Sequence, residues 1–123
     1  MDITPPRVIA FDFDGVIAHY EGFKGKEDIQ QPNPEVIKTM SALREQGCKI
    51  MIHSTRGNEF LARYCEQFSI PVDYINSRPD KQGDNPGKPI ATVYVDDRAL
   101  CYRGQSAEAL VAEITNFKTY WQK

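Results

Sequence analysis

Two pairs of carboxylates follow short apolar runs in this sequence, and their types and spacing suit metal chemistry. Asp12 and Asp14 close the run in FDFDG, and Asp96 and Asp97 close the run in VYVDD. Side chains two positions apart on a strand tend toward the same side. Clustered carboxylates repel each other unless they share a proton or a cation, and Mg²⁺ prefers hard oxygen ligands. The pattern therefore predicts a magnesium site built from these acids.

The first acid pair, taken alone, is also compatible with a simple turn. Asp and Gly at the end of a strand are common turn residues. An EF-hand calcium loop does not fit, because its glutamate comes eleven residues after the first aspartate, where this chain has Phe23. A receiver-type phosphoacceptor has adjacent acids on its first strand and its nucleophile on a middle strand, which is not the order found here.

The segments that would position these acids alternate between strands and helices. Short apolar runs rich in β-forming residues predict four strands, within residues 7–14, 48–54, 72–75 and 91–97. An N-cap asparagine followed by proline and glutamate predicts a helix between Asn33 and Gly47. Its apolar stripe is formed by Val36, Ile37, Met40 and Leu43. A second helix is predicted over Asn58–Phe68.

Three further segments complete the chain. Residues 15–33 are rich in glycine and charge and predict a small hairpin, whereas the composition of Asn76–Pro89 predicts a loop. A last helix is predicted near the C-terminus, with an apolar face expected in the core. That face is formed by Leu110, Ile114, Phe117 and Trp121.

Alternating strands and helices build a parallel sheet that is covered by helices on both faces. We therefore predict an α/β fold of three layers, a Rossmann-like doubly wound parallel sheet, in one domain over residues 1–123. Ligands bind such sheets beyond the carboxyl ends of the strands, where the strand order reverses. The two strands that end in acids should therefore be neighbours.

Four motifs in order resemble those of the haloacid dehalogenase-like (HAD) superfamily: FDFDGVI, IMIHSTRG, GKP and VYVDDRA. The resemblance covers most of the chain. It implies a HAD-like hydrolase that uses Mg²⁺ and cleaves phosphomonoesters through an aspartyl-phosphate intermediate. Asp12 would be the nucleophile and Asp14 the general acid and base. Asp14 favours a phosphatase over a dehalogenase, because dehalogenases of this superfamily lack the second acid.

The resemblance also implies which residues bind phosphate. Ser54 would supply a hydroxyl and Lys88 a cation, and Thr55 and Arg56 would contact substrate beside Ser54. Lys81 is the alternative lysine, because Lys88 lies closer to the last motif than in many members of the superfamily.

The implied metal ligands come from both acid pairs. Asp12, the backbone carbonyl of Asp14, and Asp96 would hold Mg²⁺, with waters completing an octahedron. Asp97 would act directly or through a water molecule.

Most of the other polar residues near the motifs have two interpretations. Arg56 and Arg98 either contact substrate or pair with the acids of the site. His53 is expected to point away from the site, because it alternates with Ser54 along a strand. Residues of the predicted hairpin either contact substrate or are solvated: His19, Tyr20 and Lys24.

The spacing of the motifs leaves no room for a cap domain. Residues 12–54 are occupied by a loop, a helix and a strand, and residues 54–88 by a helix, a short strand and a loop. A site without a cap should be open, so we expect a phosphorylated substrate that can be large. A second copy of the chain, in a homo-oligomer, could also cover it.

Composition and motifs limit the alternative functions of the chain. The formal net charge of −2 argues against strong sequence-independent binding to nucleic acid. Polynucleotide phosphatase domains are nevertheless capless relatives with a DDR ending, which VDDRA resembles, so a nucleic-acid 3′-phosphatase is the enzymatic alternative. A non-catalytic phosphate-binding module is the other alternative, disfavoured by the full set of acids.

The sequence also gives evidence on the cellular location of the protein. The three cysteines form no close pair, which favours reduced thiols. The N-terminus lacks the long apolar segment of a secretory signal, and no apolar stretch is long enough to cross a membrane. These features predict a cytoplasmic protein with no membrane partner.

Overall fold

A parallel sheet organises the computed structural model, which describes residues 7–20, 22, 30–77 and 88–122. The four strands lie in the order β3-β2-β1-β4 and all pairs are parallel. Their bounds are Val8–Phe11 for β1, Lys49–Ile52 for β2, Tyr74–Ile75 for β3 and Val93–Val95 for β4. The α/β, Rossmann-like fold class is confirmed, and the two strands that end in acids are neighbours as predicted.

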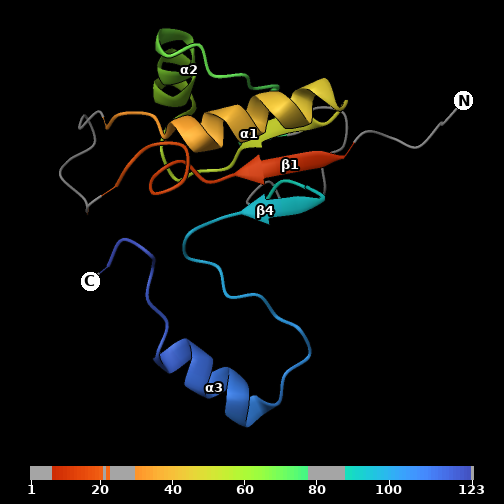
Figure 1. Ribbon diagram of the computed structural model, residues 1–123, viewed down its shortest axis with the longest axis vertical. Coiled ribbons are helices and arrows are strands. Elements are labelled where there is room, and N and C mark those ends of the chain that lie inside the picture. Colours follow the sequence, from red (N-terminus) through yellow and green to blue (C-terminus); the bar gives the residue numbers. More distant parts are fainter. Residues whose placement is uncertain (1–6, 21, 23–29, 78–87, 123) are drawn as a thin grey trace, which may run out of the picture.

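Helices α1 and α2 cover one face of this sheet (Figure 1). α1 spans Pro34–Glu45, and the Asn33 side chain caps it by accepting the Glu35 N–H at 3.2 Å. α2 spans Asn58–Gln67. Both helices pack into the larger hydrophobic core, where Met40 and Leu61 are fully buried against side chains of β1 and β2. Burial of this face is the main stabilising contribution to the site's scaffold.

The other face of the sheet carries a smaller cluster. Val8 and Ala10 of β1 and Met51 of β2 are buried there, with Tyr74 and Ala91 packed against them. Because successive side chains of a strand point to opposite faces, buried residues on both faces account for the continuous apolar runs of these strands.

Helix α3, Ala107–Thr115, departs from the prediction. It lies apart from the sheet at the end of a long connection from β4 (Figure 1). The expected core positions are not buried: Ile114 is 60% exposed and Phe117 38% exposed, and Leu110 and Trp121 are only half buried. Phe117 and Trp121 also lie beyond the end of the helix. The prediction that this apolar face lies in the core was wrong, because an apolar stripe identifies one face of a helix but does not identify the surface that covers it.

Two predicted segments fall partly outside the described residues. In the predicted hairpin, residues 21 and 23–29 are not described, and Ala18 forms isolated bridges with Asp14 and Pro32. Residues 78–87 of the predicted loop are likewise outside. Among the described helices, none has the length and apolar character needed to cross a membrane.

The contrast between α2 and α3 gives a direct test of this architecture. Leu61→Ala removes a fully buried side chain and should lower the free energy of unfolding by about 2–5 kcal/mol. Ile114→Ala should change it by less than about 0.5 kcal/mol, because that side chain is mostly exposed. Urea unfolding followed by circular dichroism measures both. Equal losses for the two variants would mean that α3 packs into the core.

Candidate functional site

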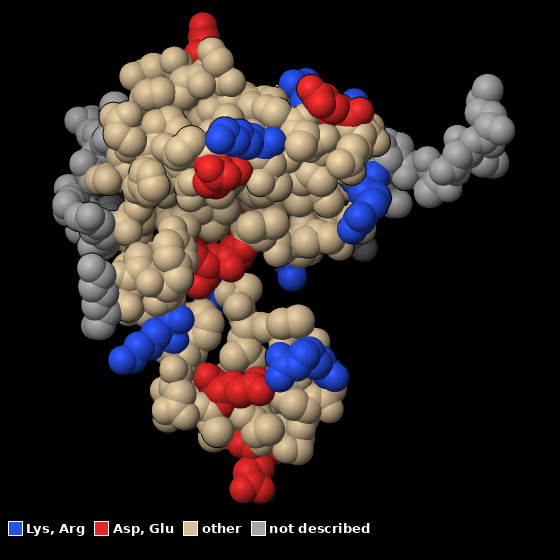
Figure 2. Space-filling model, viewed as in Figure 1, with Lys and Arg blue, Asp and Glu red and all other residues tan. Residues whose placement is uncertain are grey.

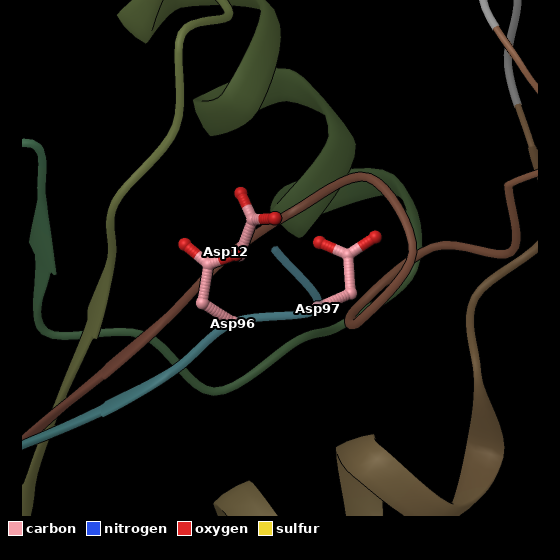
Figure 3. A group of neighbouring side chains, drawn as sticks. All are labelled: Asp12, Asp96 and Asp97. Atoms are coloured by element: carbon pink, nitrogen blue, oxygen red, sulfur yellow. The ribbon is translucent and has the colours of Figure 1, made fainter. Parts of the chain in front are cut away.

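Three carboxylates meet where β1 and β4 end. Asp12 follows the last residue of β1, and Asp96 and Asp97 follow the last residue of β4. The Asp12 N–H donates to the Val95 carbonyl at 2.9 Å, which extends the pairing of the two strands into the site. One oxygen from each carboxylate lies within 4.8 Å of the others (Figure 3). The strand pairing therefore enforces the proximity of these like charges.

This proximity changes the acidity of Asp12. Its pKa is raised from an ordinary value of 3.8 to about 8, first by burial, then by a side-chain hydrogen bond with Asp97 and the charge of Asp96. A hydrogen bond with the Phe13 backbone opposes the increase in pKa. The ionised cluster is thus unfavourable unless a proton or a cation is shared.

The donor set fits a hard divalent cation. All three side chains offer carboxylate oxygens, the ligand type that Mg²⁺ takes in proteins. Asp97 Oδ1 is buried and has no hydrogen-bond partner among the described residues. A buried acceptor without a donor is costly, and coordination of a cation would satisfy it.

Asp14 lies outside this cluster because its carboxylate is paired with Arg56. Arg56 Nε lies 2.8 Å from Asp14 Oδ2, and Nη2 lies 2.8 Å from Oδ1. The guanidinium group also lies over the Phe60 ring, 4.8 Å from its centroid. Bidentate contact holds the orientation of both side chains. Arg56 therefore pairs with an acid of the site, one of the two interpretations that the sequence left open.

The loop after β2 positions Ser54 and Thr55 beside the acids. The Ser54 N–H donates to Asn76 Oδ1 at 2.8 Å, and the Ser54 hydroxyl accepts the Arg56 N–H at 3.1 Å. Asn76 in turn donates from Nδ2 to Asn58 Oδ1 at 2.7 Å, which links this loop to the start of α2. These bonds fix the loop without using the proton of the Ser54 hydroxyl.

A pocket of about 380 Å³ opens at this edge of the sheet. Its walls carry acids from both strands, the loop after β2, and two side chains from other loops. The lining residues are Asp12, Asp14, Tyr20, His53, Ser54, Thr55, Asp96 and Arg98. In the space-filling view, acidic side chains are visible in the hollow between the part that holds the sheet and the part that holds α3 (Figure 2).

The predicted phosphate-binding lysine is not part of that lining. The Lys88 ammonium lies 4.7 Å from the centroid of the Tyr94 ring. Lys81, the alternative, lies outside the described residues. The assignment of the lysine stays a prediction.

His53 differs from the sequence prediction. It was expected to point away from the site, but it lines the pocket, and its Nδ1 atom is buried without a hydrogen-bond partner in the described part of the chain. The His53 N–H still donates to the Phe11 carbonyl at 2.9 Å, and the His53 ring contacts Tyr94, so strand alternation continues at position 53. His53 lines the pocket because the pocket extends to this face of the sheet. Tyr20 also lines the pocket.

Sequence reasoning missed a contact from the C-terminal segment. The Trp121 indole N–H donates to Asp97 Oδ2 at 2.5 Å, and the Tyr120 hydroxyl donates to the Gly15 carbonyl. Gly15 has a φ of +85°, and a Cβ there would overlap the Asp97 carboxylate and lie 3.1 Å from Trp121 Nε1. The helical spacing of Trp121 predicted a core residue, and no short-range pattern indicates this long-range contact.

Comparison with known proteins gives evidence on the fold. No protein-family model and no curated protein matches the chain. Two solved structures share its fold. One is a conserved protein from Bacteroides thetaiotaomicron, with a TM-score of 0.62 and 22% identity over 89% of each chain. The other belongs to a Pnkp1/Rnl/Hen1 complex, with a TM-score of 0.50 and 16% identity over 77% of this chain and 48% of that one.

The acidity of Asp12 makes stability depend on pH in the metal-free protein. Its folded pKa of about 8 exceeds its unfolded value, so its contribution to stability is complete below about pH 4 and is lost as the pH rises through about 8. The difference in unfolding free energy between wild type and Asp12→Asn should therefore shrink or reverse with rising pH. Urea unfolding with a chelator, between about pH 5 and pH 9, measures it. A difference that is constant with pH would contradict the raised pKa.

Proposed function

We propose that this chain is a magnesium-dependent phosphomonoesterase of the HAD superfamily with Asp12 as its nucleophile. The position of Asp12 carries the proposal. It follows an interior strand of the parallel sheet, lines the pocket, and lies within 4.8 Å of the acids that follow β4. Nucleophile, pocket and candidate metal ligands thus share one edge of the sheet, where such folds bind their ligands.

The metal would be held by residues of this cluster. Asp12, Asp96 and Asp97 offer carboxylate oxygens, and the superfamily resemblance adds the backbone carbonyl of Asp14. When bound, Mg²⁺ supplies positive charge that lets an anionic phosphate approach these carboxylates.

Asp12 then attacks the phosphorus atom. The new bond joins an Asp12 oxygen to phosphorus, and the bond from phosphorus to the ester oxygen breaks, which leaves an aspartyl phosphate. The Ser54 hydroxyl, which accepts the Arg56 N–H, keeps its own proton to donate to a phosphate oxygen. In the second step a water oxygen attacks phosphorus, and the bond to Asp12 breaks.

Asp14 would move the protons in both steps. It gives a proton to the departing alcohol and later takes one from the attacking water. Arg56 holds both Asp14 oxygens, so one of them has to be released before Asp14 can act. Phosphate is another strong bidentate ligand for a guanidinium group. Binding of substrate can therefore exchange Arg56 from Asp14 to the phosphate and free the acid at the reacting centre.

A nucleic acid with a terminal phosphate is the second candidate substrate. The fold is shared with a chain of a Pnkp1/Rnl/Hen1 complex, and the pocket carries Tyr20 and Arg98, groups that can stack on a base or bind a phosphate. The net charge of −2 makes a large sequence-independent interface unfavourable. Only the terminal nucleotides would then be bound.

A substrate screen separates these possibilities. Phosphate release from a panel of phosphomonoesters, including sugar phosphates, nucleotides and 3′-phosphorylated oligonucleotides, is measured with Mg²⁺ present. Release from small esters supports a general phosphomonoesterase, and selective release from oligonucleotides supports the second candidate. Binding of phosphate analogues without any release would contradict the enzymatic proposal and favour a non-catalytic phosphate-binding module.

Asp12→Asn should abolish turnover while the protein stays folded, because an amide is a much poorer nucleophile than a carboxylate. Phosphate release measures turnover, and circular dichroism verifies the fold. Glu59→Gln is the matched control, since it makes the same chemical change at an exposed position of α2 and should keep full activity. Substantial phosphatase activity in Asp12→Asn would exclude Asp12 as the nucleophile.

Asp14→Asn should reduce the rate according to the leaving group. Proton transfer by a placed carboxyl contributes about 10²- to 10⁴-fold in rate, and it matters most for a poor leaving group. The kcat for an alkyl phosphate should therefore fall further than the kcat for p-nitrophenyl phosphate. Mg²⁺ affinity should change little, because the Asp14 carboxylate pairs with Arg56 and lies outside the acid cluster.

This comparison needs one control. Asp14 also activates the water of the second step, so slow hydrolysis of the aspartyl phosphate would hide any dependence on the leaving group. Rapid-quench measurement of the intermediate shows which step limits each substrate. Equal losses on both substrates, with the first step limiting, would rule out protonation of the leaving group by Asp14.

A further inference from the structure

After α3 the chain returns to the acid cluster through residues Thr119–Trp121. Thr119 is 3% exposed, although it lies close to the end of the described chain. Gln122 closes a turn around it: its side-chain oxygen accepts the Thr119 N–H at 2.9 Å, and its own N–H donates to the Thr119 carbonyl at 3.2 Å. This segment is therefore held in place, while α3 before it is exposed.

Trp121 is enclosed by side chains of the site. Its ring meets Tyr20 edge to face at 4.9 Å between centroids, and the Arg98 guanidinium lies over it at 5.2 Å. Both neighbours line the pocket. The Tyr120 hydroxyl, bonded to the Gly15 carbonyl, anchors the segment to the loop that follows Asp12. The indole ring is thus fixed relative to both loops that carry the acids.

The indole N–H determines how the Asp97 carboxylate is turned. It donates a hydrogen bond to Asp97 Oδ2, whereas Asp97 Oδ1 is buried and lacks a hydrogen-bond partner among the residues that the structure describes. Figure 3 shows one Asp97 oxygen toward Asp12 and the other away from it. Without the indole N–H, the Asp97 carboxylate would lose the contact that fixes Oδ2, and it would be free to rotate away from the charge of Asp96. Hydrogen bonds to a ligating carboxylate commonly tune the affinity of a metal site.

We propose that Trp121 is a positioning residue that holds the Asp97 carboxylate ready for a divalent cation, and so makes the C-terminal segment part of the metal site. The inference rests on the metal site of the proposed function. It assigns to Trp121 a role through Asp97, with no contact to substrate.

The chain offers a direct spectroscopic readout, because Trp121 is its only tryptophan. The experiment titrates the metal-free full chain with MgCl₂, by isothermal calorimetry and by tryptophan fluorescence. The variants are Trp121→Phe, Asp97→Asn and the double variant, with thermal melting to establish that each is folded. Tyr102→Phe is the control, because Tyr102 is an exposed aromatic residue that precedes α3.

We expect Mg²⁺ to change the Trp121 fluorescence of wild type saturably, and Asp97→Asn to remove this response. Trp121→Phe should weaken calorimetric Mg²⁺ affinity by about 10-fold or more, the effect typical of a lost hydrogen bond to a metal ligand. Tyr102→Phe should bind as wild type does. In the double variant the loss should be smaller than the product of the two single losses, because both changes act on the same carboxylate.

Two results would overturn the inference while leaving the metal site intact. One is wild-type Mg²⁺ affinity in a folded Trp121→Phe protein. The other is multiplicative losses in the double variant, which would assign Trp121 a general structural role. Absence of Mg²⁺ binding to wild type at millimolar concentration would instead overturn the metal site itself, and the inference with it.

Discussion

Mutual repulsion among Asp12, Asp96 and Asp97 is the electrostatic constraint that shapes the carboxyl ends of β1 and β4. Two like charges at the separation found here, within 4.8 Å, repel by roughly 3–4 kcal/mol at the effective dielectric constant of a protein surface. A domain is stabilised by only about 5–15 kcal/mol in total. Three ionised carboxylates would therefore consume much of that stability. The parallel pairing of β1 with β4 holds them together nonetheless, and the cluster relieves its repulsion by keeping a proton on Asp12.

The four acids of the site are divided between two electrostatic environments. Asp14 is neutralised within the protein by the two hydrogen bonds from Arg56, whereas no ion pair with a cationic side chain balances the other three within the described part of the chain. An acid paired with an arginine and a cluster of unbalanced acids suit different tasks. In the proposed function the cluster would bind a cation, and the paired acid at the edge of the same pocket would be released when a phosphate competes for its arginine.

Sequence reasoning was strongest where local pattern and burial coincide. The strands and helices around the larger core were predicted within a few residues, because their apolar runs are buried on the faces that periodicity assigns. It failed for α3, because the stripe of Leu110 and Ile114 specifies a face and not a partner. It also failed for His53, because the pocket extends to the sheet face on which this side chain lies, and for Trp121, whose partner Asp97 lies 24 residues away. Contacts that depend on the course of a loop leave no periodic pattern in the sequence.

The interior position of β1 in the sheet has a consequence for folding during synthesis. β1 pairs with β4 although these strands are far apart in the sequence, as the 84 residues between Val8 and Thr92 show. Closing so long a loop costs more conformational entropy than forming helical contacts. During synthesis, Asp12 emerges long before the acids that share its site, and until then it is an ordinary solvated carboxylate. The acid cluster therefore forms only when β4 has joined the sheet. A chain that stops short of β4 would contain Asp12 but lack the two acids that lie beside it in the complete sheet.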